Sequence, residues 1–337
     1  MKGFKAGALW ARVQGVKGKS VTHHSSFITF LLLFTVHCSL FTAFYGCASA
    51  KIDKISPEKK TAIDLNYAGV EESNNYEKAL KKFEQALVLN KKTDNRKGII
   101  LNKINIARTC LKISRYDEAL SSIQDAVQMA ESEKDNLLLS EAYATLSKYH
   151  YLKGKTDESI KYLEMAIDID RRNGFPSIGD KLNLKALAYK EKGELDKSLD
   201  ILNEAMKKNQ GAERKAGISD SYRITAGILL LKKQFEYAKQ NFENALAIDK
   251  ELGRPNAIAL DLSGLASIHI EKGDYRGALD YLKRAYDVNT ANNDRKNALA
   301  DLDRIIETAA MLKDEDAVTF FLDKRKKLIS QDNQLNK

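Results

Sequence analysis

The chain has 337 residues, of which 43% are hydrophobic and 30% are charged. This composition is typical of a folded, soluble protein and excludes a chain that is disordered throughout. The formal net charge of +9 is compatible with binding to nucleic acid or to an anionic membrane. Five of the 55 bases and none of the 46 acids lie in residues 1–50, so the rest of the chain is nearly balanced. That balance, and the lack of a basic run interleaved with aromatic residues, disfavour a nucleic-acid partner.

The amino-terminal segment has the pattern of an export signal. No charged residue lies between Lys19 and Lys51, and an apolar run begins at Phe27 and continues to about Phe44. A basic segment followed by an apolar segment and small residues predicts a secretory signal. The basic flank stays inside the cell, so we expect the rest of the chain to be exported.

Three outcomes are open for this signal. Residues 44–47, Phe-Tyr-Gly-Cys, resemble a bacterial lipobox with Cys47 as the lipidated residue, although Phe44 and Tyr45 depart from its usual pattern. The resemblance implies a lipoprotein signal peptide over residues 1–46 and a lipid-anchored linker over residues 47–58. Cleavage after residues 48–50, Ala-Ser-Ala, is the second outcome, and an uncleaved transmembrane anchor is the third. A lipid on Cys47, followed by Ala48 and not by Asp, points to the bacterial outer membrane, facing the periplasm.

A repeating pattern covers residues 59–330. Each copy has a bulky residue, a small residue three positions later, an apolar residue four further on and usually an alanine three beyond that. The small residue recurs at steps of 39 or 40, at Ala79, Ala119, Ser159, Ser198, Ala238, Ala278 and Ala317. Residues three and four apart share one helix face, and two small residues there let a second helix approach closely. The pattern therefore predicts a helix that packs tightly on a partner.

The residues between these helices predict the partner and the turns. Apolar stripes with a period near 3.6 precede each copy, and Gly154, Gly193 and Gly273 fall where the two helices must turn. Pro176 and Pro255 lie where a new helix can begin. Two helices per unit predict an all-α solenoid of about seven helix-turn-helix repeats, ending in a flexible tail over residues 331–337. Lys324 replaces the second small residue of the last copy, which is typical of a capping helix with a polar outer face.

The segments Gly273–Leu279 and Phe242–Leu246 resemble the tetratricopeptide repeat. The resemblance implies a right-handed superhelix whose concave groove is lined by the first helix of each repeat. The period of about 40 departs from the usual 34 and is similar to the longer-helix variant of peptide-sensing and motor-cargo adaptor members. The groove positions that it implies are Leu101, Ile104, Arg108 and Leu111; Glu141, Ala144, Lys148 and Tyr151; Asp180, Asn183, Leu187 and Lys190; and Asp220, Arg223, Gly227 and Leu230. Among them, Arg108, Lys148, Lys190 and Arg223 would form a basic strip, to which Tyr151 and Asn183 would add binding groups.

Catalytic residues are scarce. His150 and His269 lie at the register position that Cys110 and Tyr189 occupy in other copies, which favours packing between helices. A nucleophilic pair of Cys110 and His150 would have no third residue to orient it. No histidine or cysteine spacing predicts a metal site, and no cofactor is expected.

We therefore expect a non-enzymatic scaffold that holds a protein or peptide partner in its groove within a bacterial envelope assembly. A partner of acidic or amphipathic character would suit the basic strip. A regulator that senses a peptide and changes its superhelical pitch is the alternative, and an envelope enzyme using Cys110 is a third.

Overall fold

The computed structural model describes residues 55–72 and 75–335, with side chains up to residue 330. The predicted signal peptide and Cys47 lie outside these residues. The described part contains fourteen helices and no strand, which confirms the predicted all-α solenoid of seven helix pairs. The first helices of the pairs are α2 (Pro57–Glu71), α4 (Arg96–Lys112), α6 (Asn136–Leu152), α8 (Ile178–Glu191), α10 (Lys215–Leu231), α12 (Pro255–Glu271) and α14 (Arg295–Met311). The second helices are α3 (Tyr76–Lys92), α5 (Tyr116–Ser132), α7 (Thr156–Asn173), α9 (Leu195–Gly211), α11 (Phe235–Leu252), α13 (Tyr275–Ala291) and α15 (Glu315–Leu335).

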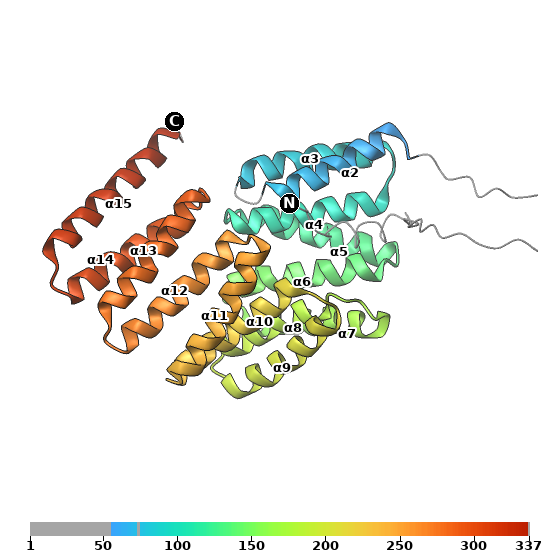
Figure 1. Cartoon of the computed structure of the whole chain (residues 1–337). Helices are drawn as coiled ribbons and strands as arrows, with labels where there is room; N and C mark the ends of the chain where they lie inside the picture. Colours follow the sequence, from blue (N-terminus) through green and yellow to red (C-terminus); the bar gives the residue numbers. More distant parts are fainter. Residues whose placement is uncertain (1–54, 73–74, 336–337) are drawn as a thin grey trace, which may run out of the picture. The chain divides into compact units, whose positions relative to one another are not determined.

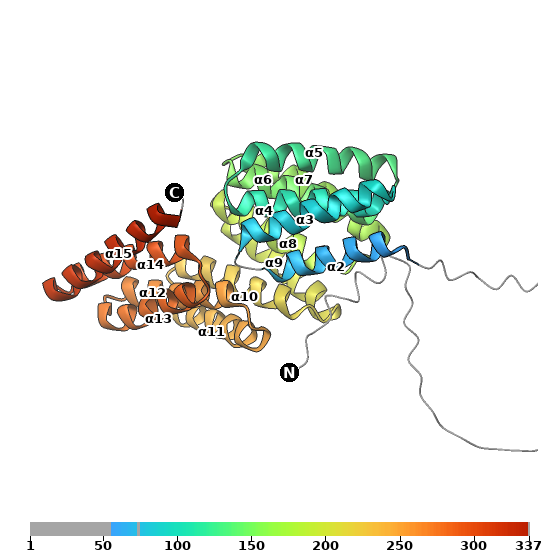
Figure 2. The same cartoon turned by 90° about the horizontal axis from the view of Figure 1, so that it is seen from above.

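The helices stack in chain order. Each packs against the next along the sequence, as the run of colours in Figure 1 and Figure 2 shows. Several first helices also touch the first helix of the next pair, in the pairs α2–α4, α4–α6, α8–α10 and α10–α12. Packing chiefly between near neighbours is the signature of a solenoid, in which each repeat buries its apolar face against the next.

The predicted small residues form the seam between the two helices of each pair. Those of the first six copies are all buried, as are the alanines seven positions later: Ala86, Ala126, Ala166, Ala205, Ala245 and Ala285. Larger apolar side chains such as Phe83, Leu163 and Leu282 pack around this seam. The register seen in the sequence is therefore the contact line of the helices.

The turns follow a common backbone pattern. Gly154, Gly193 and Gly273 have φ values of +72°, +77° and +75°, a conformation that glycine adopts without a steric penalty. The corresponding turn of the fifth pair has Lys233 at φ +57°, which is costlier for a residue with a Cβ atom. Pro255 begins α12, as predicted, at a position where its missing N–H is not needed.

The last pair differs from its expected form in two respects. Helix α15 continues through residues 331–335, part of the segment assigned to a flexible tail. The amine of Lys324 does not face water alone, because it lies 5.3 Å from the ring centroid of Tyr286 and 5.2 Å from that of Phe320. Cation–π contacts with these rings explain why a lysine can replace the small residue here.

Candidate functional site

Side-chain bonds link the first helices of successive repeats. The guanidinium of Arg108 on α4 bonds the carboxylate of Glu141 on α6 at 2.6 Å. The amine of Lys181 on α8 reaches the same carboxylate at 2.8 Å. Further along, the Arg223 guanidinium on α10 bonds the Asp261 carboxylate on α12 at 2.7 Å. We call the surface made by the predicted groove positions of α4, α6, α8 and α10 the first-helix face.

Most of the predicted groove positions are half-buried on this face. They are Leu101, Arg108, Glu141, Lys148, Tyr151, Asp180, Leu187, Lys190, Asp220, Arg223, Gly227 and Leu230. The others are buried, namely Ile104, Leu111, Ala144 and Asn183. The Asn183 amide donates to the carbonyl of Gly217 at 2.7 Å and accepts from the hydroxyl of Ser221 at 2.7 Å. Asn183 therefore joins α8 to α10, and its side chain does not reach the open face.

Glu141 is the centre of a chain of ion pairs that runs into the core. Lys181, whose side chain is 3% exposed, bonds both Glu141 and the fully buried Asp170, at 2.8 and 2.7 Å. Burial alone would raise the pKa of Glu141, but Lys181 and Arg108 outweigh it and lower this pKa to about 2. Arg108 also donates to the hydroxyl of Thr145 at 3.1 Å. The charge of Arg108 is thus partly compensated inside the fold.

Arg223 belongs to a second cluster, made of two arginines and three aspartates. It bonds Asp220 and Asp261 at 2.7 Å each and also pairs with Asp249. Arg254 bonds Asp249 at 2.9 Å and Asp220 at 3.1 Å. Burial raises the pKa of Asp261 to about 7; Asp249 acts in the same direction and Arg223 against it. Carboxylates of its own and the next repeat therefore neutralise Arg223.

The other two predicted bases, Lys190 and Lys148, have fewer charged partners. The Lys190 amine is 3.7 Å from the Glu191 carboxylate, and its stem lies beside Gly227. Lys148 has no hydrogen bond or ion pair with any residue that the structure describes. Burial raises the pKa of Tyr151 to about 12, and Glu191 acts in the same direction. The four bases therefore do not form a continuous strip of unpaired charge, and the unpaired charge lies at Lys148.

A row of buried polar residues was missed by the sequence analysis. It lies eleven positions after the small residue of the first six copies, at Asn90, Asp170, Asn209, Asp249 and Asn289, with Ala130 as the exception. Three of them bond the next first helix: Asn90 donates to Asn102 and Asn289 to Asp301, each at 2.6 Å, and Asp170 accepts from Lys181 at 2.7 Å. Asparagine or aspartate at one fixed register in five copies of six was the signal that could have revealed this row.

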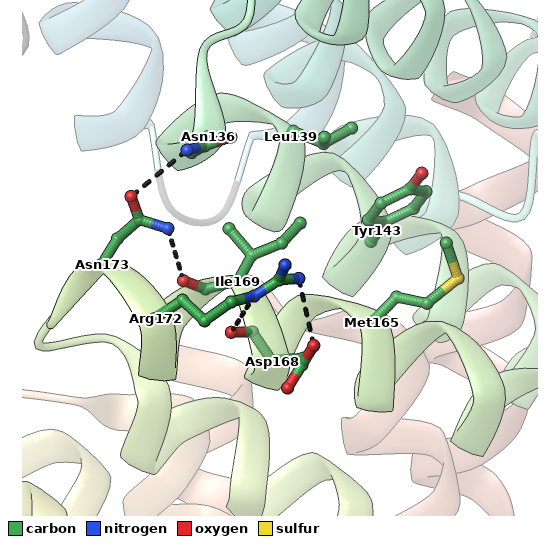
Figure 3. A pocket seen from close by; sticks show the side chains of 8 residues that line it. All are labelled: Asn136, Leu139, Tyr143, Met165, Asp168, Ile169, Arg172 and Asn173. Atoms are coloured by element: carbon green, nitrogen blue, oxygen red, sulfur yellow. Dashed lines mark hydrogen bonds and ion pairs between the residues drawn. The ribbon is translucent and has the colours of Figure 1, made fainter.

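A pocket of about 530 Å³ opens between α6 and α7 (Figure 3). No predicted groove position lines it. Its lining residues are Asn136, Leu139, Tyr143, Met165, Asp168, Ile169, Arg172 and Asn173. The polar ones are largely paired with one another, since Arg172 bonds Asp168 at 3.0 Å and the Asn136 amide donates to Asn173 at 3.2 Å. The pocket thus offers an apolar surface of Leu139, Tyr143 and Met165 without an unpaired charge.

The candidate nucleophile and its base lie in packing environments. Cys110 is fully buried, and burial raises the pKa of its thiol to about 11, so the reactive thiolate is scarce at neutral pH. The His150 ring stacks on Tyr162 with centroids 5.2 Å apart, and burial lowers its pKa. His269 instead shares a hydrogen bond of 2.7 Å with Asp274, the residue that caps α13. These contacts account for both histidines as structural residues.

The described residues contain no group of three or more histidine, cysteine or acidic side chains that could hold a metal ion. None of their helices has both the length and the hydropathy that a membrane span requires.

Comparisons with known proteins agree on the repeat. A tetratricopeptide repeat model matches residues 98–172, which span α4 to α7, and a second matches residues 262–296. No curated protein matches the chain in sequence.

Several solved structures share the fold at low sequence identity. Aspartyl phosphate phosphatase F from Bacillus subtilis is 16% identical with a TM-score of 0.57, over 70% of this chain and 61% of that one. A signal transduction ATPase with a tetratricopeptide repeat sensor from Pyrococcus horikoshii is 15% identical with a TM-score of 0.55, over 82% and 44% of the two chains. A Rap protein complexed with Competence and Sporulation Factor is 14% identical with a TM-score of 0.52, over 82% and 99%. The chain therefore carries tetratricopeptide repeats in residues 98–172 and 262–296, within a stack of seven helix pairs.

Proposed function

We propose that this protein is a non-enzymatic scaffold that holds a protein or peptide partner on its first-helix face. The observation that carries the proposal is the linked row of first helices, whose half-buried groove positions combine charged side chains with Leu101, Leu187 and Leu230. Such a surface can bind an extended partner with most of the binding energy at a few anchor side chains, and not in proportion to the contact area. The Rap protein complexed with Competence and Sporulation Factor shows that a related solenoid can hold another molecule.

We further propose that the protein is a lipoprotein of the bacterial envelope, tethered through Cys47 and facing the periplasm. The support is the apolar run that ends in Gly46-Cys47. Metabolic labelling with an alkyne fatty acid tests this directly. Label should enter the wild-type protein and the Cys38→Ala control, which removes the other cysteine of the segment, and should be lost in Cys47→Ala. Label that persists in Cys47→Ala contradicts the proposed anchor.

The binding proposal is tested by charge reversal on the face. Lys148→Glu should reduce recovery of a partner crosslinked in native membranes, whereas Lys161→Glu, on an exposed position of second helix α7, should not. Circular dichroism of both variants checks that helicity is kept. Equal recovery from both variants would show that the face does not carry the partner.

A peptide-sensing regulator is the second candidate, favoured by a contact between distant repeats. The side chain of Tyr76, at the start of α3, interacts with that of Asn256 at the start of α12. A ligand that changes the superhelical pitch would break this contact. Small-angle scattering of the wild type and of Tyr76→Phe, with and without the crosslinked partner, tests this candidate, and a profile unchanged by saturating partner counts against it.

A further inference from the structure

We propose that the pocket between α6 and α7 (Figure 3) binds a small uncharged molecule that joins an aromatic ring to an amide group. The inference goes beyond the proposed scaffold, because no groove position of the first-helix face lines this pocket. Its volume of about 530 Å³ lies within the range of small-molecule sites in proteins. Its apolar end, its amide end and its balanced charge each restrict the ligand.

The third helix pair has an opening where the second pair has an ion pair. In the second pair, Lys103 on α4 and Asp125 on α5 bridge the two helices at 2.5 Å. The same two register positions of the third pair are occupied by Tyr143 on α6 and Met165 on α7, and both line the pocket. The register position of Met165 is polar in the other six copies, namely at Gln85, Asp125, Glu204, Asn244, Arg284 and Asp323. A methionine that is 36% exposed at this position therefore indicates a surface that receives an apolar group.

Tyr143 and Met165 form the apolar end of the pocket. The Tyr143 hydroxyl donates to Glu131 on α5 at 2.8 Å, and its ring stacks on Tyr162 with centroids 6.0 Å apart. These two contacts fix the ring before a ligand arrives, which lowers the entropic cost of binding. A thioether beside a fixed ring favours an aromatic ligand, because sulfur–aromatic and ring–ring contacts both add to the burial of apolar surface.

Two asparagine amides form the other end of the pocket, as Figure 3 shows. Asn136 donates to the side-chain carbonyl of Asn173 at 3.2 Å, and Asn173 donates to the backbone carbonyl of Ile169 at 2.8 Å. The side-chain carbonyl of Asn136 accepts no hydrogen bond from any residue that the structure describes. It can accept an N–H of a ligand, and the second N–H of either asparagine can donate to a ligand carbonyl. An amide group matches both requirements.

The charges at the pocket cancel. Arg172 and Asp168 pair with each other at 3.0 Å, and their side chains are 69% and 60% exposed. An ionic ligand would lose part of its hydration on entering the pocket and would find no unpaired charge there. An uncharged ligand avoids this cost.

The length of α6 between the two ends sets the length of the ligand. Asn136 and Tyr143 are seven residues apart, which is about 10 Å along the helix, and Leu139 lies between them. A molecule that reaches both ends therefore needs a short aliphatic linker between its ring and its amide. This linker would cover the Leu139 side chain.

Fluorine NMR can test the site in the full-length protein in lipid nanodiscs. The probe is 4-(4-fluorophenyl)butanamide, and 4-(4-fluorophenyl)butanoate is its charged control. We expect the protein to broaden the resonance of the amide more strongly than that of the butanoate at equal concentration. No broadening of the amide resonance, or equal broadening of both, would overturn the proposal.

Variants locate the binding. Met165→Trp should fill the pocket and abolish the broadening, whereas Met165→Leu keeps an apolar side chain and should retain it. Met311→Trp, at a 65% exposed position on α14, controls for the added indole and should behave as the wild type. Circular dichroism checks that the three variants keep their helicity. Broadening in Met165→Trp equal to that of the wild type would overturn the site.

Loss of the amide contact should weaken binding without closing the pocket. Asn136→Ala should raise the dissociation constant of the amide probe about fivefold, as expected for one neutral hydrogen bond. Asn244→Ala, at an exposed position on α11, should leave it unchanged. An unchanged dissociation constant in Asn136→Ala would contradict the amide end of the site.

Competition identifies the class of ligand. Unlabelled 4-phenylbutanamide should displace the probe at a lower concentration than 4-cyclohexylbutanamide, and the reverse order would contradict an aromatic ligand. An acetylated, amidated Gly-Gly-Phe-Gly-Gly peptide should compete less well than 4-phenylbutanamide. Stronger competition by the peptide would overturn the assignment to a small molecule, because the pocket would then receive an aromatic residue of a peptide chain. None of these results depends on a partner of the first-helix face, so failure of the scaffold proposal would leave this site unaffected.

Discussion

The amine of Lys181 donates to the carboxylate of Glu141 across 2.8 Å and 40 residues of sequence, one repeat along the chain. Both residues belong to first helices, and Lys181 also bonds the buried Asp170. Lys181 therefore links Glu141, on the first-helix face, to the core of the preceding helix pair. The positive charge of Lys181 also offsets the negative charge of Glu141, a predicted groove position.

Removing Lys181 should destabilise the protein strongly. In Lys181→Met, Asp170 would lose its buried cation, and breaking such a pair typically costs about 3–5 kcal/mol. Lys185→Met is the matched control, because Lys185 pairs with the exposed Glu164, and it should change stability by about 0.5 kcal/mol or less. Urea unfolding followed by circular dichroism measures both. Equal stability of the two variants would contradict the role given to Lys181.

The pattern of small residues was sufficient to predict the fold, because helix packing depends on shape at fixed spacing. Ala119 and Ala126 could be placed at a helix contact from their register alone. The pairing of charges could not be predicted in this way. Lys181 lies one residue from a predicted groove position, yet it points into the core, and Arg108 could be paired with Glu141 only once the rotation of both helices was known.

The titration of Asp261 and Asp301 should lower the free energy of unfolding as the pH rises from about 4 to 7. Burial raises the pKa of Asp261 to about 7 and that of Asp301 to about 6, above the unfolded value near 3.8. In this window the folded protein holds more protons than the unfolded chain, so the free energy of unfolding decreases with rising pH.

Asp261→Asn tests this pH dependence. The variant should show a smaller decrease in the free energy of unfolding between pH 4.5 and 7.5 than the wild type, because the neutral amide does not titrate. Asp323→Asn, on the exposed side of α15, serves as a control and should keep the wild-type slope. Urea unfolding at a series of pH values gives these slopes. An identical slope in Asp261→Asn would show that Asp261 does not titrate in this window.

Glycine in place of Lys233, in the turn of the fifth pair, should stabilise the protein. Lys233 has φ +57°, whereas Gly273 has φ +75° at the equivalent turn of the next pair. Lys233→Gly should therefore stabilise the protein by about 0.5–1 kcal/mol, and Gly273→Ala should destabilise it by about 1–2 kcal/mol. Thermal unfolding would reveal the two opposite shifts, and shifts of the same sign would contradict this reading of the turns.

The contact between the fifth and sixth pairs should not tolerate one added methyl group. A Cβ atom at Gly264 on α12 would lie 2.3 Å from the Phe242 ring, whereas one at Gly211 on α9 would meet nothing within 4 Å. Gly264→Ala should cost about 1–3 kcal/mol through overpacking. Gly211→Ala should be neutral or stabilising by up to about 1 kcal/mol. Comparable stability of both variants would show that the contact between α11 and α12 is looser than described.

Site-specific photo-crosslinking in native membranes can show whether a partner binds on the first-helix face. A photoreactive residue at Leu187, half-buried on the first-helix face, is compared with one at Lys161, exposed on second helix α7. We expect a discrete crosslinked partner from position 187 that is reduced by Lys148→Glu, and none from position 161. A partner captured from position 161 alone, or from both positions equally, would contradict binding on the first-helix face.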